Sequence, residues 1–253
     1  MATHGAASAP PPSPLDAGVF FPVGSRPPQP LRGHGFLVHG ARAAGKTSLA
    51  FQAAINTVLY GGGDSESSSV VVLCQESAFY TKVPQPFTPL GSLAESALNR
   101  IEFIYVESWT AALREMMGFR TTRAVPTLVL VDDDGFEVAA PAERGGGRGG
   151  QHPEVVAAAA AASCLSYLES LHQWVSRHGR AFFYVLVTNQ LPESATQLSL
   201  PYAAFPVVNV WVGASGAVHI TPTPADTAAA TAPTHITWMN GLHLRDGGAS
   251  RCG

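Results

Sequence analysis

The apolar residues of this chain fall into short unbroken runs, separated by segments in which apolar positions recur at helical spacing. Short runs rich in Val, Ile and Leu are typical of strands that are buried on both faces of a parallel sheet. Helical segments between such runs are typical of crossover helices that cover the sheet. The expected strands are residues 35–39, 70–73, 101–106, 127–131 and 182–187, and the expected helices are residues 48–55, 110–117 and 154–177.

The pattern changes after residue 190, where shorter apolar runs are separated by turns at 207–212, 217–221 and 235–239. Closely spaced short strands joined by turns indicate antiparallel pairing. We therefore predict an α/β fold with a mostly parallel sheet, helices on both faces and a C-terminal antiparallel extension that closes the sheet.

The ends of the chain differ in composition from its middle. Residues 1–33 are rich in Pro and Ala, which is typical of a disordered tail, and residues 247–253 are expected to form a flexible C-terminus. The folded domain is therefore expected to span residues 34–246. A glycine-rich stretch at residues 145–150 predicts a mobile loop within it.

Charge and hydropathy exclude some classes of partner. The chain has 253 residues, of which 13% are charged, a formal net charge of −3 and a pI near 6.3, so it has no bulk attraction for nucleic acid or for an anionic lipid surface. No uninterrupted apolar run approaches the length of a transmembrane helix. We expect no membrane partner.

A glycine loop, Gly40 to Thr47, lies between the first expected strand and the first expected helix and reads G-A-R-A-A-G-K-T. It matches the phosphate-binding pattern G-x-x-x-x-G-K-[ST]. Glycines let backbone N–H groups approach phosphate oxygens, and the N-terminus of the next helix directs partial positive charge at the same anion. Nucleotide contacts are expected from Gly40, Ala41, Arg42, Ala43, Ala44, Gly45, Lys46, Thr47 and Ser48.

The last two residues of this loop carry its chemistry. We expect Lys46 to reach the β- and γ-phosphates of ATP, and the Thr47 hydroxyl to bind Mg²⁺. The chain has only two lysines, Lys46 and Lys82, so a lysine here by chance is not expected. ATP and Mg²⁺ are therefore the expected cofactors.

Three aspartates, Asp132, Asp133 and Asp134, follow the fourth expected strand. A carboxylate at the carboxyl end of a buried strand is where phosphate-loop proteins hold the metal, opposite the loop hydroxyl. Asp132 fits best because it comes first after the apolar run, whereas Asp133 or Asp134 serves if the strand ends later. The alternative is a solvated acidic turn.

Two further polar residues follow core strands. Glu76 comes after the second strand and could orient and polarise an attacking water. Gln190 comes after the fifth strand, where an amide can donate to a γ-phosphate oxygen and move the loop that follows. Both share the carboxyl edge of the sheet with the glycine loop.

The order of these motifs resembles the RecA-like recombinase core, a P-loop NTPase fold, and looks most like the eukaryotic recombinase paralogues. The small size is similar to the ATPase subunit of Shu-type complexes, whose partner is a SWIM-domain zinc protein. The resemblance covers about residues 35–248 and implies a nucleotide-binding pair, a metal aspartate, a catalytic glutamate and a residue linking ATP to DNA: Lys46 and Thr47, Asp132, Glu76 and Gln190. It rests on the glycine loop and on V-L-C-Q-E-S-A-F (72–79), L-V-L-V-D (128–132) and V-L-V-T-N-Q (185–190).

The sequence departs from that family where its members face DNA. The first corresponding loop, residues 135–153, has only Arg144 and Arg148, and no Lys or Arg occurs between Arg180 and Arg245. Affinity for DNA rests largely on neutralising phosphates, so this surface supplies little of it alone. Tyr202 and Phe205 could stack on single-stranded bases, but burial in the core is the favoured interpretation.

Together these observations predict an ATP-binding, slowly hydrolysing protein of the recombinase-paralogue type. The resemblance implies homologous-recombination DNA repair in the nucleus, within a heteromeric complex that holds a recombinase-related or SWIM-domain partner and meets single-stranded DNA through that complex. Its ATPase activity is expected to be weak and to depend on DNA or the partner. Two alternatives are a nucleotide-gated protein-interaction scaffold without useful hydrolysis and a small-molecule P-loop kinase.

Overall fold

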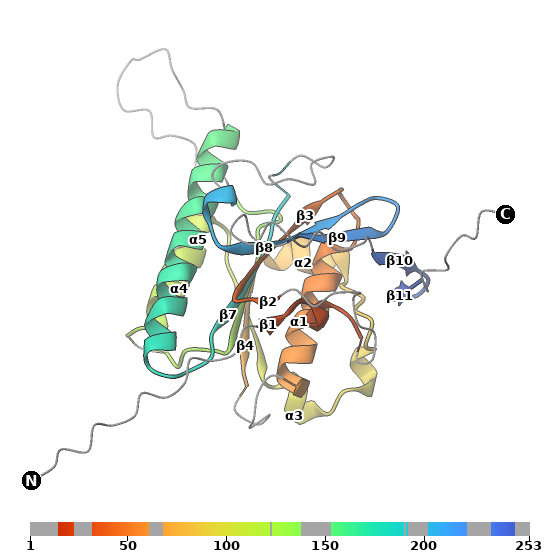
Figure 1. Cartoon of the computed structure of the whole chain (residues 1–253), viewed down its shortest axis with the longest axis horizontal. Helices are drawn as coiled ribbons and strands as arrows, with labels where there is room; N and C mark the ends of the chain where they lie inside the picture. Colours follow the sequence, from red (N-terminus) through yellow and green to blue (C-terminus); the bar gives the residue numbers. More distant parts are fainter. Residues whose placement is uncertain are drawn as a thin grey trace, which may run out of the picture.

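The computed structural model describes residues 15–22, 32–60, 68–121, 123–137, 153–189, 191, 202–221 and 234–245. Its centre is a nine-stranded sheet with the strand order β11-β10-β9-β8-β3-β7-β6-β4-β5 (Figure 1). The strands are β3 (Gly35–Gly40), β4 (Val70–Cys74), β5 (Ile101–Tyr105), β6 (Leu128–Asp132), β7 (Phe183–Val187), β8 (Val207–Val212), β9 (Ala217–Thr221), β10 (Thr234–Trp238) and β11 (Leu242–Leu244).

The sheet combines a parallel part with an antiparallel end. Strands β8, β3, β7, β6, β4 and β5 pair in parallel, whereas β9, β10 and β11 continue the sheet in antiparallel pairs. All eight expected strands are present, with ends shifted by at most one residue. The predicted α/β fold with a C-terminal antiparallel extension is confirmed. Strand β11 was not predicted.

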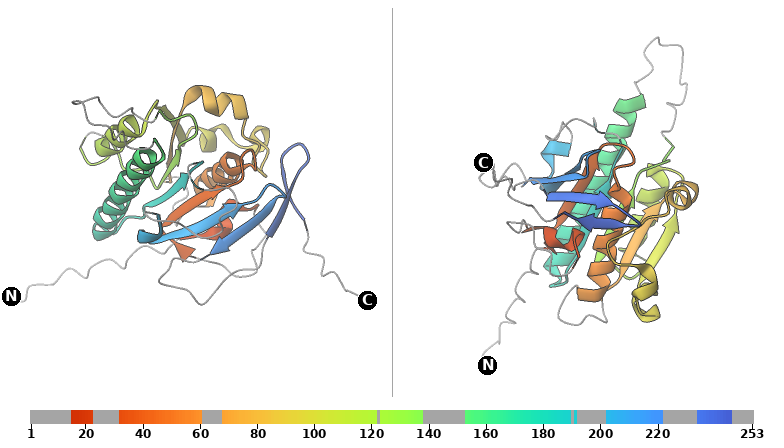
Figure 2. Two further views of the ribbon diagram at one scale, coloured as in Figure 1. Left: turned by 90° about the horizontal axis from the view of Figure 1, so that it is seen from above. Right: turned by 90° about the vertical axis from the view of Figure 1, so that its right-hand side faces the viewer.

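Helices cover both faces of the sheet, as predicted. Helix α1 (Lys46–Tyr60) lies on one face, and α4 (Trp109–Gly118) and α5 (Pro153–Arg177) lie on the other (Figures 1 and 2). Two short helices, α2 (Glu76–Lys82) and α3 (Glu95–Leu98), were not predicted. Three single-turn 3-10 helices complete the described structure: η1 (Ala17–Phe20), η3 (Leu90–Ser92) and η4 (Tyr202–Ala204).

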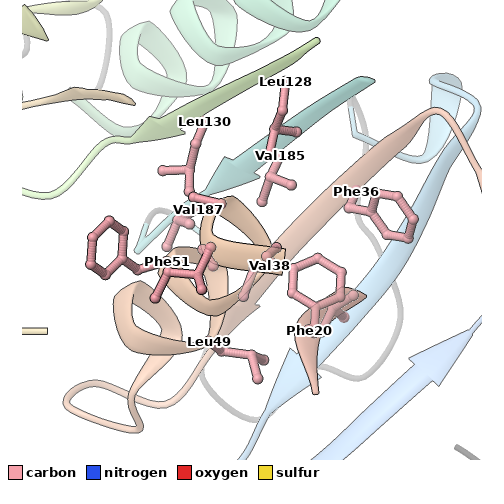
Figure 3. Close-up of a cluster of buried hydrophobic side chains, with 14 of the residues drawn as sticks. Phe20, Phe36, Val38, Leu49, Phe51, Leu128, Leu130, Val185 and Val187 are labelled. Carbon is pink, nitrogen blue, oxygen red and sulfur yellow. The ribbon is translucent and has the colours of Figure 1, made fainter. Parts of the chain in front are cut away.

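The face beneath α1 has a continuous apolar core. Figure 3 shows the side chains of Leu49 and Phe51 on α1 in one buried cluster with those of Val38, Leu130 and Val187, which come from three neighbouring strands. All five are buried. Burying one such side chain contributes about 1.5–3 kcal/mol, so this packing fixes α1, and with it the loop that begins the helix, against the sheet.

Part of the expected N-terminal tail is folded, which corrects the prediction for residues 1–33. Residues Leu15–Asp16 (β1) pair with Arg32–Gly33 (β2), and η1 packs against α1. Phe20 and Phe21 are 0% and 2% exposed. The two rings enter the α1 core, where Phe20 meets Phe36 edge-on with ring centroids 5.2 Å apart. Two aromatic rings bury enough apolar area to order a segment whose composition alone indicated disorder.

A polar residue of α1 holds this segment in place. The side-chain amide of Asn56 donates to the carbonyl oxygens of Val19 and Phe21, both at 2.8 Å, and its oxygen accepts from Gln52 at 3.0 Å. A buried polar group is stable only when such bonds are made. The remaining parts of the expected tail, residues 145–150 and residues 247–253 lie outside the described residues.

One described helix has the length and composition to cross a membrane, the segment Val155–Arg177 of α5. Its inner face packs on the sheet through buried side chains, among them Leu165, Leu168 and Leu171. Tyr202 is also buried in this cluster, and Phe205 packs against it partly buried. The structure thus agrees with the core interpretation of these two aromatic residues.

We expect Asn56→Ala to destabilise the protein, because it leaves the carbonyls of Val19 and Phe21 without their donor. The loss should be about 1–3 kcal/mol of unfolding free energy, measured by urea denaturation. Ser163→Ala is the control, since that exposed hydroxyl on α5 bonds to the Ala159 carbonyl of its own helix. Equal stability of the two variants would contradict the proposed anchoring of the N-terminal segment.

Candidate functional site

The glycine loop connects β3 to α1 in a conformation that favours small residues. Gly40, Ala43 and Gly45 have positive φ angles of 124°, 53° and 85°. The Ala41 N–H donates to the Val212 carbonyl at 2.8 Å, which ties the start of the loop to β8. At position 40 a side chain would collide with the backbone of Val212, 2.2 Å from its carbonyl oxygen. The first glycine of the motif is thus required by the fold itself.

Lys46 folds back over this loop. Its ammonium donates to the carbonyl oxygens of Gly40 at 3.2 Å and Ala41 at 2.6 Å. Burial lowers the pKa of Lys46, and the nearby Lys82 ammonium lowers it further, against the opposing effect of the aspartates around Asp132. Two cations close together in a partly buried site are stabilised by an anion between them. The first-turn N–H groups of α1, which have no intrahelical partner, add positive potential at the same place.

Thr47 joins the loop to the acidic end of β6. Its hydroxyl donates to Oδ2 of Asp132 at 2.6 Å, although the two residues are 85 positions apart. Asp132 is the last residue of β6 and is 3% exposed. Strand β7 lies between β3 and β6, so Thr47, which follows β3, and Asp132, which ends β6, meet across the end of β7.

The other two aspartates have different hydrogen-bond partners. Asp133 accepts hydrogen bonds from the Thr188 hydroxyl and from the Asn189 N–H, the latter at 3.0 Å, and thereby fixes the end of β7. Burial raises the pKa of Asp133 to about 7, and its two acidic neighbours raise it further, although these hydrogen bonds oppose the shift. Asp134 accepts from the Asn189 amide at 3.0 Å. Of the three carboxylates, therefore, only Asp132 bonds to the Thr47 hydroxyl.

Lys82, the last residue of α2, reaches into this acidic group. Its ammonium forms an ion pair with Asp134 at 2.7 Å and lies 3.5 Å from Asp132 and 3.2 Å from the Thr47 hydroxyl. The side chain is 31% exposed, compared with 4% for that of Asp132. It is thus a cation at the mouth of the site, above a buried carboxylate.

A cavity of about 740 Å³ lies beside these residues at the carboxyl edge of the sheet; Thr47 and Asp134 line it, whereas Asp132 and Asp133 are not part of its wall. That volume is within the range of small-molecule sites, and the carboxyl edge of a parallel sheet is where such sites commonly lie. The wall is formed by the loop, the end of α2 and single residues from three strand ends: Arg42, Ala43, Ala44, Gly45, Lys46, Thr47, Ser48, Lys82, Val83, Gln85, Asp134, Asn189 and Trp238.

Trp238 comes from β10, in the antiparallel extension, and covers part of the loop. A Cβ atom at Gly45 would lie 1.7 Å from Cζ2 of this indole, so the ring is packed directly against the loop backbone. At 39% exposure it remains accessible from the cavity. The distant end of the chain thus supplies an aromatic face to the site, which local sequence patterns did not indicate.

The predicted site residues are only partly brought together. The glycine loop and Asp132 meet, as the Thr47 contact shows. Ser48 accepts from the Gln85 N–H at 2.9 Å, which gives it a structural bond at the edge of the cavity. Glu76 begins α2 beside the end of β4, but its side chain is exposed and does not line the cavity. Gln190 lies outside the described residues.

Lys82 and Asn189 are among the cavity residues that were given no role of their own by the sequence patterns. Asn189 sits one position before the predicted Gln190, and its side chain lines the cavity. The one feature of the sequence that could have indicated Lys82 is the rarity of lysine: the chain has only two, and both line this cavity. The place of Lys82 was not accessible without knowing that α2 ends beside the glycine loop.

The donor atoms suit a hard divalent cation. Thr47 and Asp132 offer a hydroxyl and a carboxylate oxygen, which Mg²⁺ prefers, and Mg²⁺ commonly takes its other ligands from water and substrate phosphates. Among the described residues no group of three or more His, Cys, Asp or Glu side chains could hold a metal alone. A metal here would therefore depend on a bound ligand for part of its coordination.

Comparison with known proteins adds no assignment: the chain matches no protein-family model, and no curated protein matches it.

His39, one residue before the loop, makes the fold sensitive to acid. It is fully buried, and its Nε2–H donates to Oδ1 of Asn209 at 2.6 Å. Nδ1 has no hydrogen-bond partner among the described residues. Burial lowers the pKa of His39 to about 4, and Lys46 lowers it further, although the Asn209 bond opposes the shift.

We expect the stability conferred by neutral His39 to be complete above pH 6.5 and to fall as the pH drops towards 4, since only the unfolded chain takes up the proton in that range. The slope for one such group is about 1.4 kcal/mol per pH unit. Urea unfolding at pH 7 and pH 5 should show a smaller pH dependence for His39→Gln than for the natural protein. Parallel pH profiles for the two proteins would refute this assignment.

Proposed function

We propose that this protein binds ATP together with Mg²⁺ through the glycine loop, in a RecA-like P-loop domain. The observation that carries the proposal is the contact between the Thr47 hydroxyl and the buried Asp132 at 2.6 Å, beside a cavity whose wall includes Thr47 and Lys46. The sheet is compatible with a phosphate-loop or Rossmann-like fold, with β3 and β4 separated by β7 and β6.

Each residue has a proposed task in binding. The N–H groups of the loop and of the first turn of α1 hold the phosphates, and Lys46 leaves its loop carbonyls to neutralise them. Thr47 and Asp132 would hold Mg²⁺, which supplies charge neutralisation at the β- and γ-phosphates. Ala43 and Ala44 present only small side chains to the cavity.

Hydrolysis is proposed to be slow. Glu76 is our candidate for orienting the attacking water, since it follows β4, the strand next to β6. Its exposed side chain lies outside the cavity wall, so it is not held in a reactive position in the isolated chain. Phosphate-loop proteins often complete their site with a group from a neighbour. A partner or DNA that brings Glu76 to the cavity would therefore stimulate the reaction.

The cellular role rests on the sequence resemblance. We propose that the protein acts in homologous-recombination repair in the nucleus, in a heteromeric complex with a recombinase-related or SWIM-domain protein. Single-stranded DNA would be met through that complex, and no membrane would be involved. Isolation of the tagged protein from native cells followed by mass spectrometry tests this role. Recovery of metabolic enzymes instead of recombination proteins would contradict it.

Lys46→Arg should weaken ATP binding at least about tenfold, because the planar guanidinium does not replace a point charge against the loop carbonyls and phosphates. Isothermal titration with ATP and Mg²⁺ measures the effect. Arg177→Lys, an exchange between the same two residue types at the exposed end of α5, is the control and should leave the affinity unchanged. Equal affinities of Lys46→Arg and the natural protein would remove Lys46 from the site.

Glu76→Gln distinguishes a slow enzyme from a nucleotide-gated scaffold, an alternative that the exposed position of Glu76 favours. For an enzyme we expect at least a tenfold loss of phosphate release with ATP affinity retained, because the amide cannot accept the proton of the water. Glu95→Gln in α3 is the control, because it makes the same exchange at another exposed glutamate. Unchanged phosphate release in Glu76→Gln supports the scaffold.

A further inference from the structure

Lys82 is the one lysine of this chain that the proposed nucleotide motif leaves without a role. It lies 36 positions after Lys46, yet both side chains line the same cavity. Lys46 holds the base of the loop through the carbonyls of Gly40 and Ala41, whereas Lys82 stands beside Thr47 and Asp132. The two ammonium groups are thus placed on different parts of one wall.

The position of Lys82 is built into the fold by bonds between α1 and the segment after α2. The Gln85 N–H donates to the Ser48 hydroxyl at 2.9 Å, and the Thr88 N–H donates to Oε1 of Gln52 at 2.8 Å. The Gln52 amide in turn donates to the Thr88 hydroxyl at 3.0 Å. Because α1 begins at the glycine loop, these bonds hold the end of α2 at a fixed place relative to that loop.

The end of α2 is also conformationally unusual. Val83, the residue that caps the helix, has φ 44° and ψ 76°, in the left-handed region. A β-branched residue rarely adopts this conformation, because its side chain clashes with the backbone, and such strain is retained where the surrounding structure imposes it. Val83 itself lines the cavity next to Lys82. The sharp end of the helix leaves Lys82 at the cavity mouth.

The present partners of Lys82 mark a place for positive charge. Its ammonium lies 2.7 Å from Asp134, 3.2 Å from the Thr47 hydroxyl and 3.5 Å from Asp132. The last two are the residues to which the proposed function assigns Mg²⁺, so the ammonium must give up those two contacts when they hold the metal. Its ion pair with Asp134 can persist, which keeps the ammonium beside the cavity.

We propose that Lys82 is a second lysine ligand of the nucleotide, which contacts the terminal phosphate of ATP and so distinguishes the triphosphate from the diphosphate. This inference rests on the proposed ATP site. The Lys46 ammonium, which lies against the carbonyls of Gly40 and Ala41, would serve both nucleotides. Lys82 stands on the side of Thr47 and Asp132, where the proposed Mg²⁺, and with it the terminal phosphate, would lie. In the nucleotide-free protein the same ammonium neutralises the acidic group of Asp132 and Asp134.

The test compares the affinities for ATP and ADP, each with Mg²⁺, by isothermal titration of the full-length chain. Lys82→Met should weaken ATP binding about tenfold, equivalent to about 1.4 kcal/mol, and change ADP binding less than about twofold. Lys82→Arg should retain most of the preference for ATP, since it keeps the charge. Arg114→Met on the exposed face of α4 removes the same charge far from the cavity and should change neither affinity.

A second measurement uses Mg²⁺ alone. Without nucleotide, Mg²⁺ should raise the melting temperature of Lys82→Met more than that of the natural protein, because the carboxylates of Asp132 and Asp134 have lost their internal cation. Lys82→Gln, which removes the charge but keeps a hydrogen-bonding side chain, is measured in parallel by both methods. It provides the same comparison if Lys82→Met folds poorly.

The results distinguish a failure of the proposed ATP site from a failure of the role proposed for Lys82. If the natural protein binds neither nucleotide, the proposed ATP site is wrong. If it binds both and the ratio of ATP to ADP affinity is unchanged in Lys82→Met and Lys82→Gln, only the role of Lys82 is wrong. Equal losses for ATP and ADP would also overturn the inference, since they indicate a general effect of charge without recognition of the terminal phosphate.

Discussion

The parallel pairing of β3, β7 and β6 is the constraint on which the site depends. In a parallel sheet all strands end at the same edge, so residues separated by long stretches of sequence meet there. The glycine loop follows β3, Asn189 follows β7, and Asp132 ends β6. The register of these strands brings the Thr47 hydroxyl within 2.6 Å of Asp132. A different strand order would separate the loop from its carboxylate.

Charge is balanced closely within this edge. Three aspartates and two lysines share the region, and the carboxylates share some of their donors: Asp132 accepts from Thr47, Lys82 and the Asp134 N–H, Asp133 from Thr188 and Asn189, and Asp134 from Lys82 and Asn189. The bonds of Asp133 stabilise the chain turn after β6, whereas Asp132 and Lys82 use contacts that a ligand can replace. Asp133 thus stabilises the fold, whereas its neighbour Asp132 is available to a ligand.

Helix α1 connects this edge to the rest of the domain. Its apolar residues pack on the sheet, and its buried polar residues hold two separate segments: Asn56 bonds the N-terminal segment, and Gln52 bonds the segment after α2. A buried amide can make several directional bonds, so it fixes chain segments that have little apolar area of their own. The loop at the start of α1 therefore stands on a helix that is secured on all sides.

Much of the fold was predictable from the sequence because buried parallel strands are recorded locally, as unbroken apolar runs. The eight expected strands and three expected helices are all present. The short helices α2 and α3 lacked a periodic pattern long enough to detect. Phe20 and Phe21 were not assigned to the core because a short apolar spot in a Pro-rich segment gives no indication of the surface that will bury it.

The same division applies to the site. The sequence by itself determined the glycine loop, with its lysine and threonine, and indicated Asp132 as the first carboxylate after a buried strand, since these features depend on adjacent residues. Only the tertiary structure decided that Asp133 turns towards β7, that Glu76 stays outside the cavity, and that Lys82 and Trp238 line it. These outcomes depend on strand order and on the return of distant segments over the loop, which no local pattern encodes.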